Sequence, residues 1–280
     1  MDKKPFSVAW NPWHGCTKIS EGCRYCYVYR QDARYGAEES NRCRKTAAFS
    51  LPVKKKRGGG YKIEGGSFVY TCFTSDFLLP DADEWREDCW SMMRERRDLS
   101  FIFFTKRIER LEKCLPPDWN DGNENVIIGC TTENQKRADE RLPIFRALPI
   151  AHRLIIAAPL LEKIDLSPYL DERIEEVSVG GESGVCARPL HYEWVTEMRE
   201  QCVEKNIPFC FHQTGAHFVK DGKLYTIPRR YQHSQARRAG IDFRILDDRL
   251  PDTVPLTDGK NIKTNETDGG AREKQMSVFD

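Results

Sequence analysis

Short apolar runs that alternate with helical stretches constrain the fold of this chain more than any other feature. The runs are rich in β-branched and aromatic residues and lack polar alternation, which indicates strands buried on both faces of a parallel sheet. They cover residues 6–10, 68–73, 101–104, 126–128, 154–157, 177–179 and 209–211. Amphipathic spacing predicts helices over residues 83–97, 134–147 and 191–206. We therefore expect an α/β fold, a partial or complete (β/α) TIM-like barrel.

Three segments stand outside this alternation. Residues 36–67 contain a Lys-Lys-Lys-Arg run and three consecutive glycines, which predicts an exposed insertion into a barrel that spans residues 1–218. Residues 219–246 form a basic extension, whose arginines and tyrosines permit contact with nucleic acid, although a solvated surface is the favoured interpretation. Residues 247–280 have little apolar surface to offset the entropy of ordering, so we expect a disordered tail there.

The composition bounds the class of protein. Of the 280 residues 39% are hydrophobic, which is enough to build a core, and the net charge of +1 argues against a surface that is basic throughout. No apolar run approaches the length that crosses a bilayer, and no signal-peptide pattern follows the N-terminus. We therefore expect a cytoplasmic protein that does not bind membranes, in which the 11 cysteines bind metal or are buried as small apolar side chains.

Three cysteines lie close together in the sequence, directly after the first predicted strand. Cys16, Cys23 and Cys26 fall within eleven residues, and the Cys-x-x-Cys spacing of the last two is typical of zinc and iron–sulfur sites. Three thiolates without a fourth cysteine nearby leave one coordination position open, as a catalytic centre requires. The alternative is a structural zinc site that His14 completes.

Polar residues follow most of the other predicted strands. In an α/β barrel the loops after the strands converge on one mouth, so such residues are site candidates. Helix capping explains each of them singly, but their occurrence after five apolar strands favours a shared polar site. The candidates are Ser75, Asp76, Lys106, Arg107, Glu133, Asn134, Gly181, Glu182, His212 and Gln213.

The cysteine loop resembles that of the radical S-adenosylmethionine superfamily, because Tyr25 supplies an aromatic residue just before the last cysteine. The spacing here is C-x6-C-x2-C, where the superfamily usually has C-x3-C-x2-C. The resemblance implies a barrel of the radical SAM type with a [4Fe-4S] cluster on Cys16, Cys23 and Cys26. It implies an enzyme that reductively cleaves S-adenosylmethionine to a 5′-deoxyadenosyl radical, which abstracts hydrogen from an unknown substrate. It also implies an external electron donor of the flavodoxin or ferredoxin type.

The functional groups of S-adenosylmethionine suggest roles within this site. Ser75 or Asp76 would accept a hydrogen bond from the amino group, and Glu133 and Asn134 would bind the ribose hydroxyls. The full set expected to bind the cofactor is Tyr25, Ser75, Asp76, Lys106, Arg107, Glu133, Asn134 and Gly181. The residues expected to face the substrate as catalytic candidates are Glu182, His212 and Gln213. The alternative function is that of a zinc-binding, possibly nucleic-acid-binding, interaction protein without catalysis.

The chain also resembles a bacterial and phage family of unknown function that is described as radical-SAM-like. The matching blocks are W-N-P-W-H-G-C at 10–16, T-K-R at 105–107, T-E-N-Q-K-R at 132–137, P-L-L at 159–161 and G-G-E-S-G at 180–184. The family pattern has Cys-Glu where Ala157 and Ala158 stand, and Lys where His212 stands. Since these positions are expected at the barrel mouth, the differences predict a changed substrate or a changed route.

Overall fold

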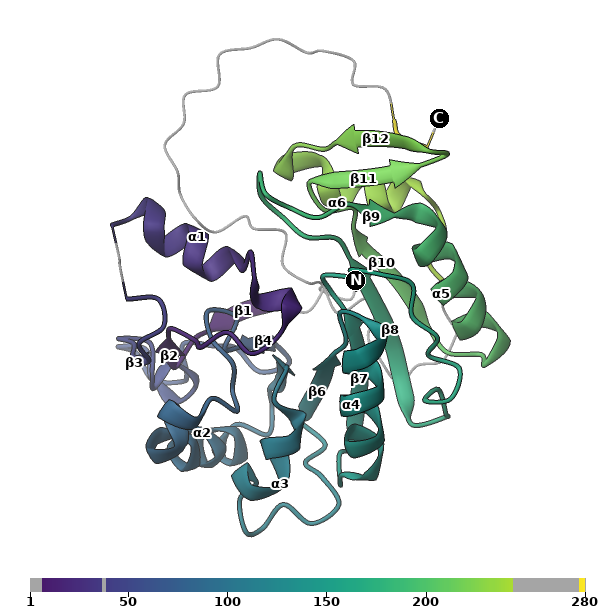
Figure 1. The fold of residues 1–280 in the computed structure, drawn as a ribbon. Helices are drawn as coiled ribbons and strands as arrows, with labels where there is room; N and C mark the ends of the chain where they lie inside the picture. Colours follow the sequence, from purple (N-terminus) through teal and green to yellow (C-terminus); the bar gives the residue numbers. More distant parts are fainter. Residues whose placement is uncertain (1–6, 37–38, 244–276, 280) are drawn as a thin grey trace.

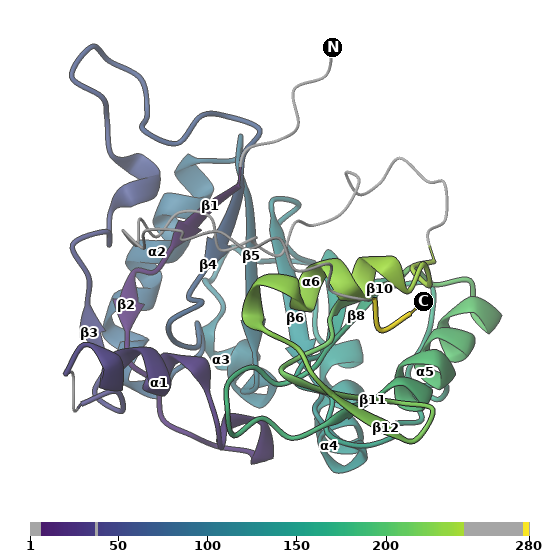
Figure 2. The same ribbon diagram turned by 90° about the horizontal axis from the view of Figure 1, so that it is seen from above.

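A computed structural model describes residues 7–36, 39–243 and 277–279. One sheet of seven parallel strands organises the molecule, and its strand order is the order along the chain (Figure 2). The strands are β1 (Ser7–Trp10), β4 (Phe68–Thr71), β5 (Ser100–Thr105), β6 (Val126–Thr131), β7 (His152–Ala157), β8 (Ile174–Gly180) and β10 (Phe209–Gln213). Each apolar run of the sequence thus forms a strand of this sheet.

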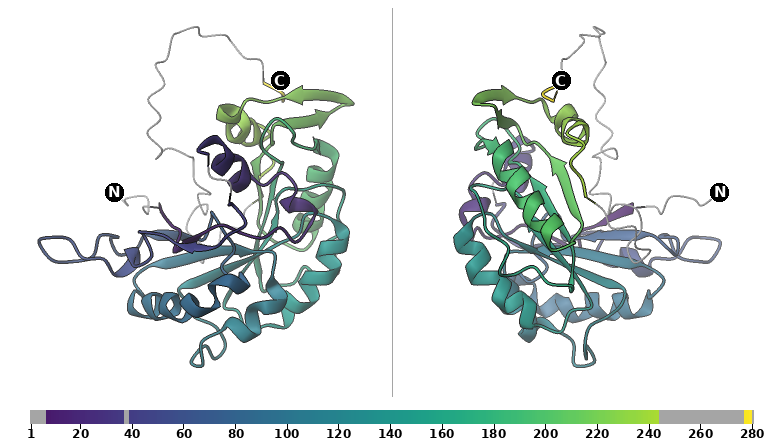
Figure 3. Two further views of the ribbon diagram at one scale, coloured as in Figure 1. Left: turned by 60° about the vertical axis from the view of Figure 1, so that its left-hand side comes forward. Right: turned by 90° about the vertical axis from the view of Figure 1, so that its right-hand side faces the viewer.

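The order of the strands explains the curvature of the sheet. Right-handed crossovers that always advance to the next neighbour place the connecting helices on one face. Figure 3 shows the helices of the first crossovers on one side of the curled sheet, with α1 (Tyr27–Arg34) and α6 (Arg229–Arg238) on the other. The crossover helices are α2 (Asp83–Glu95), α3 (Leu111–Cys114), α4 (Gln135–Ala147) and α5 (Tyr192–Glu204). The prediction of a partial α/β barrel is confirmed as a parallel half-barrel, a shape that does not by itself establish the radical SAM type.

Side chains that alternate along each strand build two separate cores. On β4, Val69 packs in the large core under the helices, whereas Phe68 and Tyr70 pack in a smaller cluster on the opposite, concave face. The smaller cluster consists of Phe68, Tyr70, Ile102, Ile127, Leu154 and Ile156. Because both faces of the sheet are apolar, the strands show no polar alternation in the sequence.

The insertion at 36–67 is anchored to the half-barrel. The two-residue strand β2 (Trp13–His14) pairs with β3 (Arg44–Lys45) inside the insertion, and the short helix η2 (Leu51–Val53) follows. Arg96, which is 1% exposed at the end of α2, donates hydrogen bonds to the carbonyl oxygens of Pro52 and, at 2.8 Å, Ile63. The insertion is therefore fixed at its base, where β3 lies next to β2 (Figure 1), and exposed at its tip at 54–60, in the loop that projects from the sheet in Figure 2.

The C-terminal part adds a small sheet and a helix to the end of the half-barrel. Strands β9 (Leu190–His191), β11 (His217–Lys220) and β12 (Lys223–Thr226) form the small sheet, and α6 packs beside β10 (Figure 2).

Most of the predicted tail at 247–280 lies outside the described residues. At 277–279 the structure differs from the prediction, because the Phe279 ring packs 5.4 Å from that of Tyr192 and 5.7 Å from that of Phe218. None of the helices in the described ranges is long and apolar enough to cross a bilayer.

Candidate functional site

The loop between β2 and α1 carries the three clustered cysteines. Gly15 has a φ of +94°, and a Cβ atom there would lie 2.1 Å from the carbonyl oxygen of Arg42, so glycine is required directly before Cys16. The single-turn helix η1 (Glu21–Cys23) then positions Cys23, and Cys26 is the residue that precedes α1. The chain thus brings three thiols onto one compact loop.

Residues that follow β4 and β5 hold the first half of this loop. The Ser75 hydroxyl donates to the carbonyl oxygen of Gly15 at 2.6 Å. The Arg107 guanidinium donates to the carbonyl and hydroxyl oxygens of Thr17 at 2.7 and 2.9 Å, and it lies 3.7 Å from the Cys16 sulfur. Two of the polar strand ends therefore contact the cysteine loop directly.

The carboxylate of Glu133, which follows β6, holds the second half. It is fully buried, accepts hydrogen bonds from the Ser20 hydroxyl and the Gly22 backbone N–H, and pairs with Arg141 at 2.7 Å. A Cβ atom at Gly22 would lie 3.1 Å from this carboxylate, so a small residue suits the close approach. The protein's own hydrogen bonds therefore fix the cysteine loop against the sheet.

A cavity of about 450 Å³ lies on the concave side of the sheet, and Cys16, Cys23 and Cys26 all line it. Apolar side chains of the concave cluster, among them Tyr70 and Ile156, line it as well. The other predicted site residues that line this cavity are Tyr25, Ser75, Asp76, Lys106, Arg107, Gly181, Glu182, His212 and Gln213. The structure thus brings most of the predicted site residues to one place.

Several lining residues were not predicted. Arg229, Gln232 and His233 reach the cavity from α6, and the basic composition of residues 219–246 was the signal that pointed to this segment. Cys72 also touches the cavity, but it is buried in the large core, as the apolar run around it predicts.

Burial shapes the acidity of the thiols. It raises the pKa of Cys16 to about 12, and the nearby Asp76 carboxylate raises it while Arg107 opposes the shift. Burial also raises the pKa of Cys26. Both groups are therefore thiols in the free protein at neutral pH, and a bound metal must displace their protons.

The described residues contain no ready-made site for a metal ion. No three of their His, Cys, Asp or Glu side chains converge closely enough to hold one. Metal or cluster ligation by the three cysteines therefore stays a prediction. His14, the fourth ligand of the zinc alternative, directs Nε2 at both oxygens of Asp32, 3.0 Å away. His14 does not line the concave cavity that the three cysteines line.

The carboxylates expected to bind a cofactor already have partners. Asp76 pairs with Arg107 at 3.1 Å and accepts a hydrogen bond from the Thr105 hydroxyl at 2.8 Å. Glu182 pairs with two nitrogens of Arg188, at 2.6 and 2.9 Å. Asp76 thus has partners within the protein, and its expected contact with the amino group of a cofactor stays a prediction.

Other residues expected to bind the cofactor also make contacts within the protein. Glu133 and Asn134 do not line the cavity, and the Asn134 side chain caps α4 by accepting from the backbone N–H of Arg137 at 2.9 Å. The close approach at Gly181 is to the Thr214 carbonyl oxygen, 2.4 Å from where a Cβ would lie. Ala157 is buried in the large core, so only Ala158 and His212 of the three departures from the family pattern line the cavity.

His212 lines the cavity from β10, the last strand of the large sheet. Burial lowers its pKa to about 3, and the nearby His233 and Arg237 lower it as well. Its ring lies 4.5 Å from that of His233, and its neighbour Gln213 donates to the Gly181 carbonyl oxygen at 3.2 Å. His212 is therefore a neutral imidazole at physiological pH.

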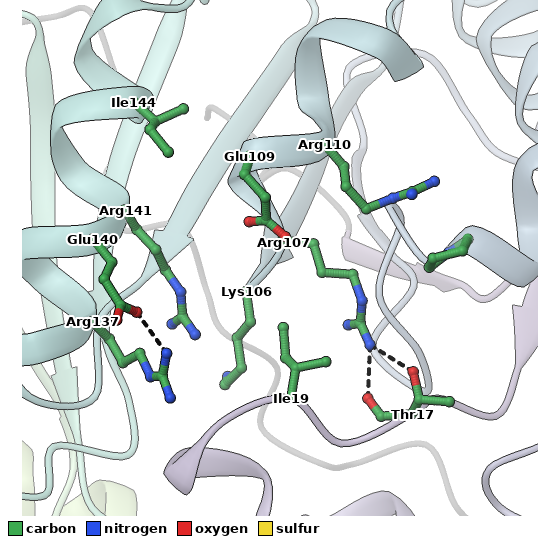
Figure 4. A pocket seen from close by; sticks show the side chains of 11 residues that line it. Thr17, Ile19, Lys106, Arg107, Glu109, Arg110, Arg137, Glu140, Arg141 and Ile144 are labelled. Carbon is green, nitrogen blue, oxygen red and sulfur yellow. Dashed lines mark hydrogen bonds and ion pairs between the residues drawn. The ribbon is translucent and has the colours of Figure 1, made fainter.

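A second cavity, of about 490 Å³, lies beside the first and shares Lys106 and Arg107 with it (Figure 4). Its arginines are paired within the protein, as Figure 4 shows for Arg137, which contacts Glu140 at 2.6 Å. In the described part of the chain the Lys106 ammonium makes no hydrogen bond or ion pair. Lys106 thus offers a cation where the two cavities meet.

Comparison with known proteins identifies a family. The family model described as "Protein of unknown function (DUF5131)" matches residues 6–266. The chain belongs to the DUF5131 family. No curated protein and no solved structure matches this DUF5131 chain. The family match overturns the expected radical SAM superfamily membership, because residues 6–266, which include the cysteine motif, match a family of unknown function without that description.

Proposed function

We propose that Cys16, Cys23 and Cys26 bind a [4Fe-4S] cluster at the wall of the concave cavity, and that the protein is an enzyme that uses S-adenosylmethionine there. The observation that supports this proposal is the placement of three thiols from one loop on a single cavity. When bound, a cluster with an iron free of cysteine would supply the electron for reductive cleavage of S-adenosylmethionine, which yields a 5′-deoxyadenosyl radical that abstracts hydrogen from a substrate.

The chain's own residues would bind and orient these groups. Arg107, 3.7 Å from the Cys16 sulfur, offsets the negative charge that a deprotonated Cys16 carries. Lys106 offers an unpaired ammonium to the cofactor carboxylate from the same cavity wall. The Tyr25 ring lies 5.1 Å from the guanidinium of Arg24 and 5.4 Å from that of Arg188, which orients a flat surface beside the last cysteine.

Anaerobic reconstitution with ferrous iron and sulfide tests the proposal. We expect brown protein with sulfide-to-iron charge-transfer absorbance, and loss of that absorbance in Cys16→Ala, Cys23→Ala and Cys26→Ala. Cys202→Ala is the matched control, because Cys202 is buried on α5 away from the cavity and its loss leaves the three ligands intact. Adding S-adenosylmethionine with dithionite, or with a flavodoxin- or ferredoxin-type donor, would then release 5′-deoxyadenosine.

Two results would overturn this function. A colourless protein that takes up one equivalent of zinc through the same cysteines would establish the zinc-binding alternative. A full cluster in Cys16→Ala would show that the loop does not supply three ligands.

A further inference from the structure

The charged groups of the concave cavity are unevenly paired. Its two carboxylates each have an arginine, because Asp76 pairs with Arg107 and Glu182 with Arg188. Lys106 and Arg229 also line the cavity, and neither forms an ion pair within the described residues. The cavity therefore retains the positive charges of Lys106 and Arg229 and favours an anionic ligand.

Helix α6 extends this positive charge away from the cavity. Arg229, His233 and Arg237 are spaced four residues apart, which places them on one stripe of the helix about 6 Å apart along its axis. Arg229 and His233 line the cavity, so Arg237 continues the stripe beyond it. The buried residues of the helix are Gln232, Gln235 and Ala236, and Gln232 also lines the cavity.

The sequence of α6 contains no acidic residue. Its sequence is RRYQHSQARR, and its arginines are exposed and have no ion pair in the part of the chain that the structure describes. Arg230 and Arg238 follow Arg229 and Arg237 in the sequence and widen the stripe, and the four arginines together form the basic stripe of α6. Arg230 lies 4.8 Å from the ring of Tyr231, which leaves its charge available. These arginines form two pairs about 12 Å apart along the helix axis, a spacing that exceeds what one phosphate needs and suits a chain of phosphates.

The floor of the cavity suits a flat, uncharged group. Tyr70, Phe73 and Phe104 line it, and their rings meet edge to face with centroids 5.3 Å apart. An aromatic floor beside a row of arginines is the combination that binds an unpaired base and its backbone. A base inside a duplex cannot reach such a floor without leaving the stack.

We propose that the substrate of this cavity is a single-stranded nucleic acid, whose phosphates lie along the basic stripe of α6 and whose base enters the cavity. This proposal names the substrate class of the proposed enzyme, and it rests on the proposed function for the reaction. Binding of the nucleic acid itself needs no iron–sulfur cluster. Binding can therefore be measured on the full-length protein before reconstitution, and it succeeds or fails independently of the iron–sulfur assignment.

Fluorescence anisotropy with labelled 12-nucleotide RNA and DNA tests the proposal over a range of salt concentrations. We expect binding that weakens with salt, and at least a tenfold loss of affinity in the variant R230A/R237A/R238A. Losing three phosphate contacts lowers the slope of log affinity against log salt by about 2. The control is K54A/K55A/R57A, which removes the same charge from the exposed insertion on a distant part of the molecule (Figure 3).

The results distinguish a single-stranded nucleic acid from a duplex and from a single nucleotide. Stronger binding of the single strand than of the matching duplex supports the proposal, as does weak competition by adenosine monophosphate alone. Equal losses in the α6 variant and the control would overturn it, because binding would then follow net charge alone. If oligonucleotides bind no more tightly than a mononucleotide, the cavity is a single-phosphate site and the proposal of a bound strand is wrong.

Discussion

The carboxylate of Glu133 at the end of β6 accepts a hydrogen bond from the backbone N–H of Gly22 at 3.3 Å, which ties the sheet to the cysteine loop. The same carboxylate pairs with Arg141, whose side chain is itself buried. This carboxylate therefore serves the architecture of the site, and the sheet and the loop share one buried ion pair.

Replacing this carboxylate should destabilise both the fold and the loop. Glu133→Ala leaves Arg141 buried without its partner, so the free energy of unfolding should fall by about 3–5 kcal/mol. Hydrogen exchange at the amides of residues 20–23 should accelerate. The control is Glu140→Ala, which removes the exposed partner of Arg137 and should cost less than about 1 kcal/mol. Equal losses in urea titrations of the two variants would contradict this role.

Gly15 should be irreplaceable for a steric reason. Gly15→Ala places a Cβ atom 2.1 Å from the Arg42 carbonyl oxygen, in addition to the strain of a positive φ. Gly59→Ala is the matched control, because Gly59 has a φ of +88° with nothing near its Cβ position, and it should cost only about 1–2 kcal/mol. Trypsin should cleave at Lys18 and Arg24 much faster in Gly15→Ala than in Gly59→Ala. Similar cleavage rates would refute the steric argument.

The sequence alone predicted the strands and the main helices, because hydrophobic runs and 3.6-residue spacing are local signals. Most of the residues that it predicted at a shared site line the concave cavity, since the carboxyl ends of parallel strands lie at one edge. It could not predict how those residues are used. Whether Asp76 is free or paired depends on where Arg107 points, and that is decided by packing between distant segments.

The contribution of α6 to the cavity was also out of reach of sequence patterns. A basic stretch such as residues 229–238 is compatible with a solvated surface, and only its packing on β10 brings Arg229 and His233 to the cavity. The Phe279 contact with Tyr192 likewise joins residues far apart in the sequence, so no local pattern predicts it.

His212 should make stability fall as the medium becomes acidic. Its folded pKa of about 3 lies below the usual value of about 6.5, so between these values the unfolded chain binds a proton that the folded chain does not. Stability is therefore lost as the pH falls below 6.5, by at most about 1.4 kcal/mol per pH unit from this group. Urea titrations at pH 7 and pH 5 should show a smaller drop for His212→Gln than for the wild type. Identical drops would mean that His212 titrates normally in the fold.

Arg96 should hold the insertion at its base. Arg96→Ala removes the hydrogen bonds to the carbonyl oxygens of Pro52 and Ile63, each worth about 1.5–3 kcal/mol for a charged donor. Trypsin should then cut the exposed run at 54–57 roughly tenfold faster or more. Arg94→Ala is the control, since Arg94 contacts only the exposed carboxylates of Glu87 and Asp118. Unchanged cleavage in Arg96→Ala would show that other contacts anchor the insertion.

The hydrogen bonds that Ser75, Arg107 and Glu133 make to the cysteine loop have a consequence for how the protein is matured. Small zinc domains fold only when the ion arrives, because metal binding provides their folding free energy. Here the polypeptide itself shapes the loop, so the proposed cluster would be loaded after folding. A cluster bound in this way would be exchangeable on the folded protein, without new synthesis of the chain.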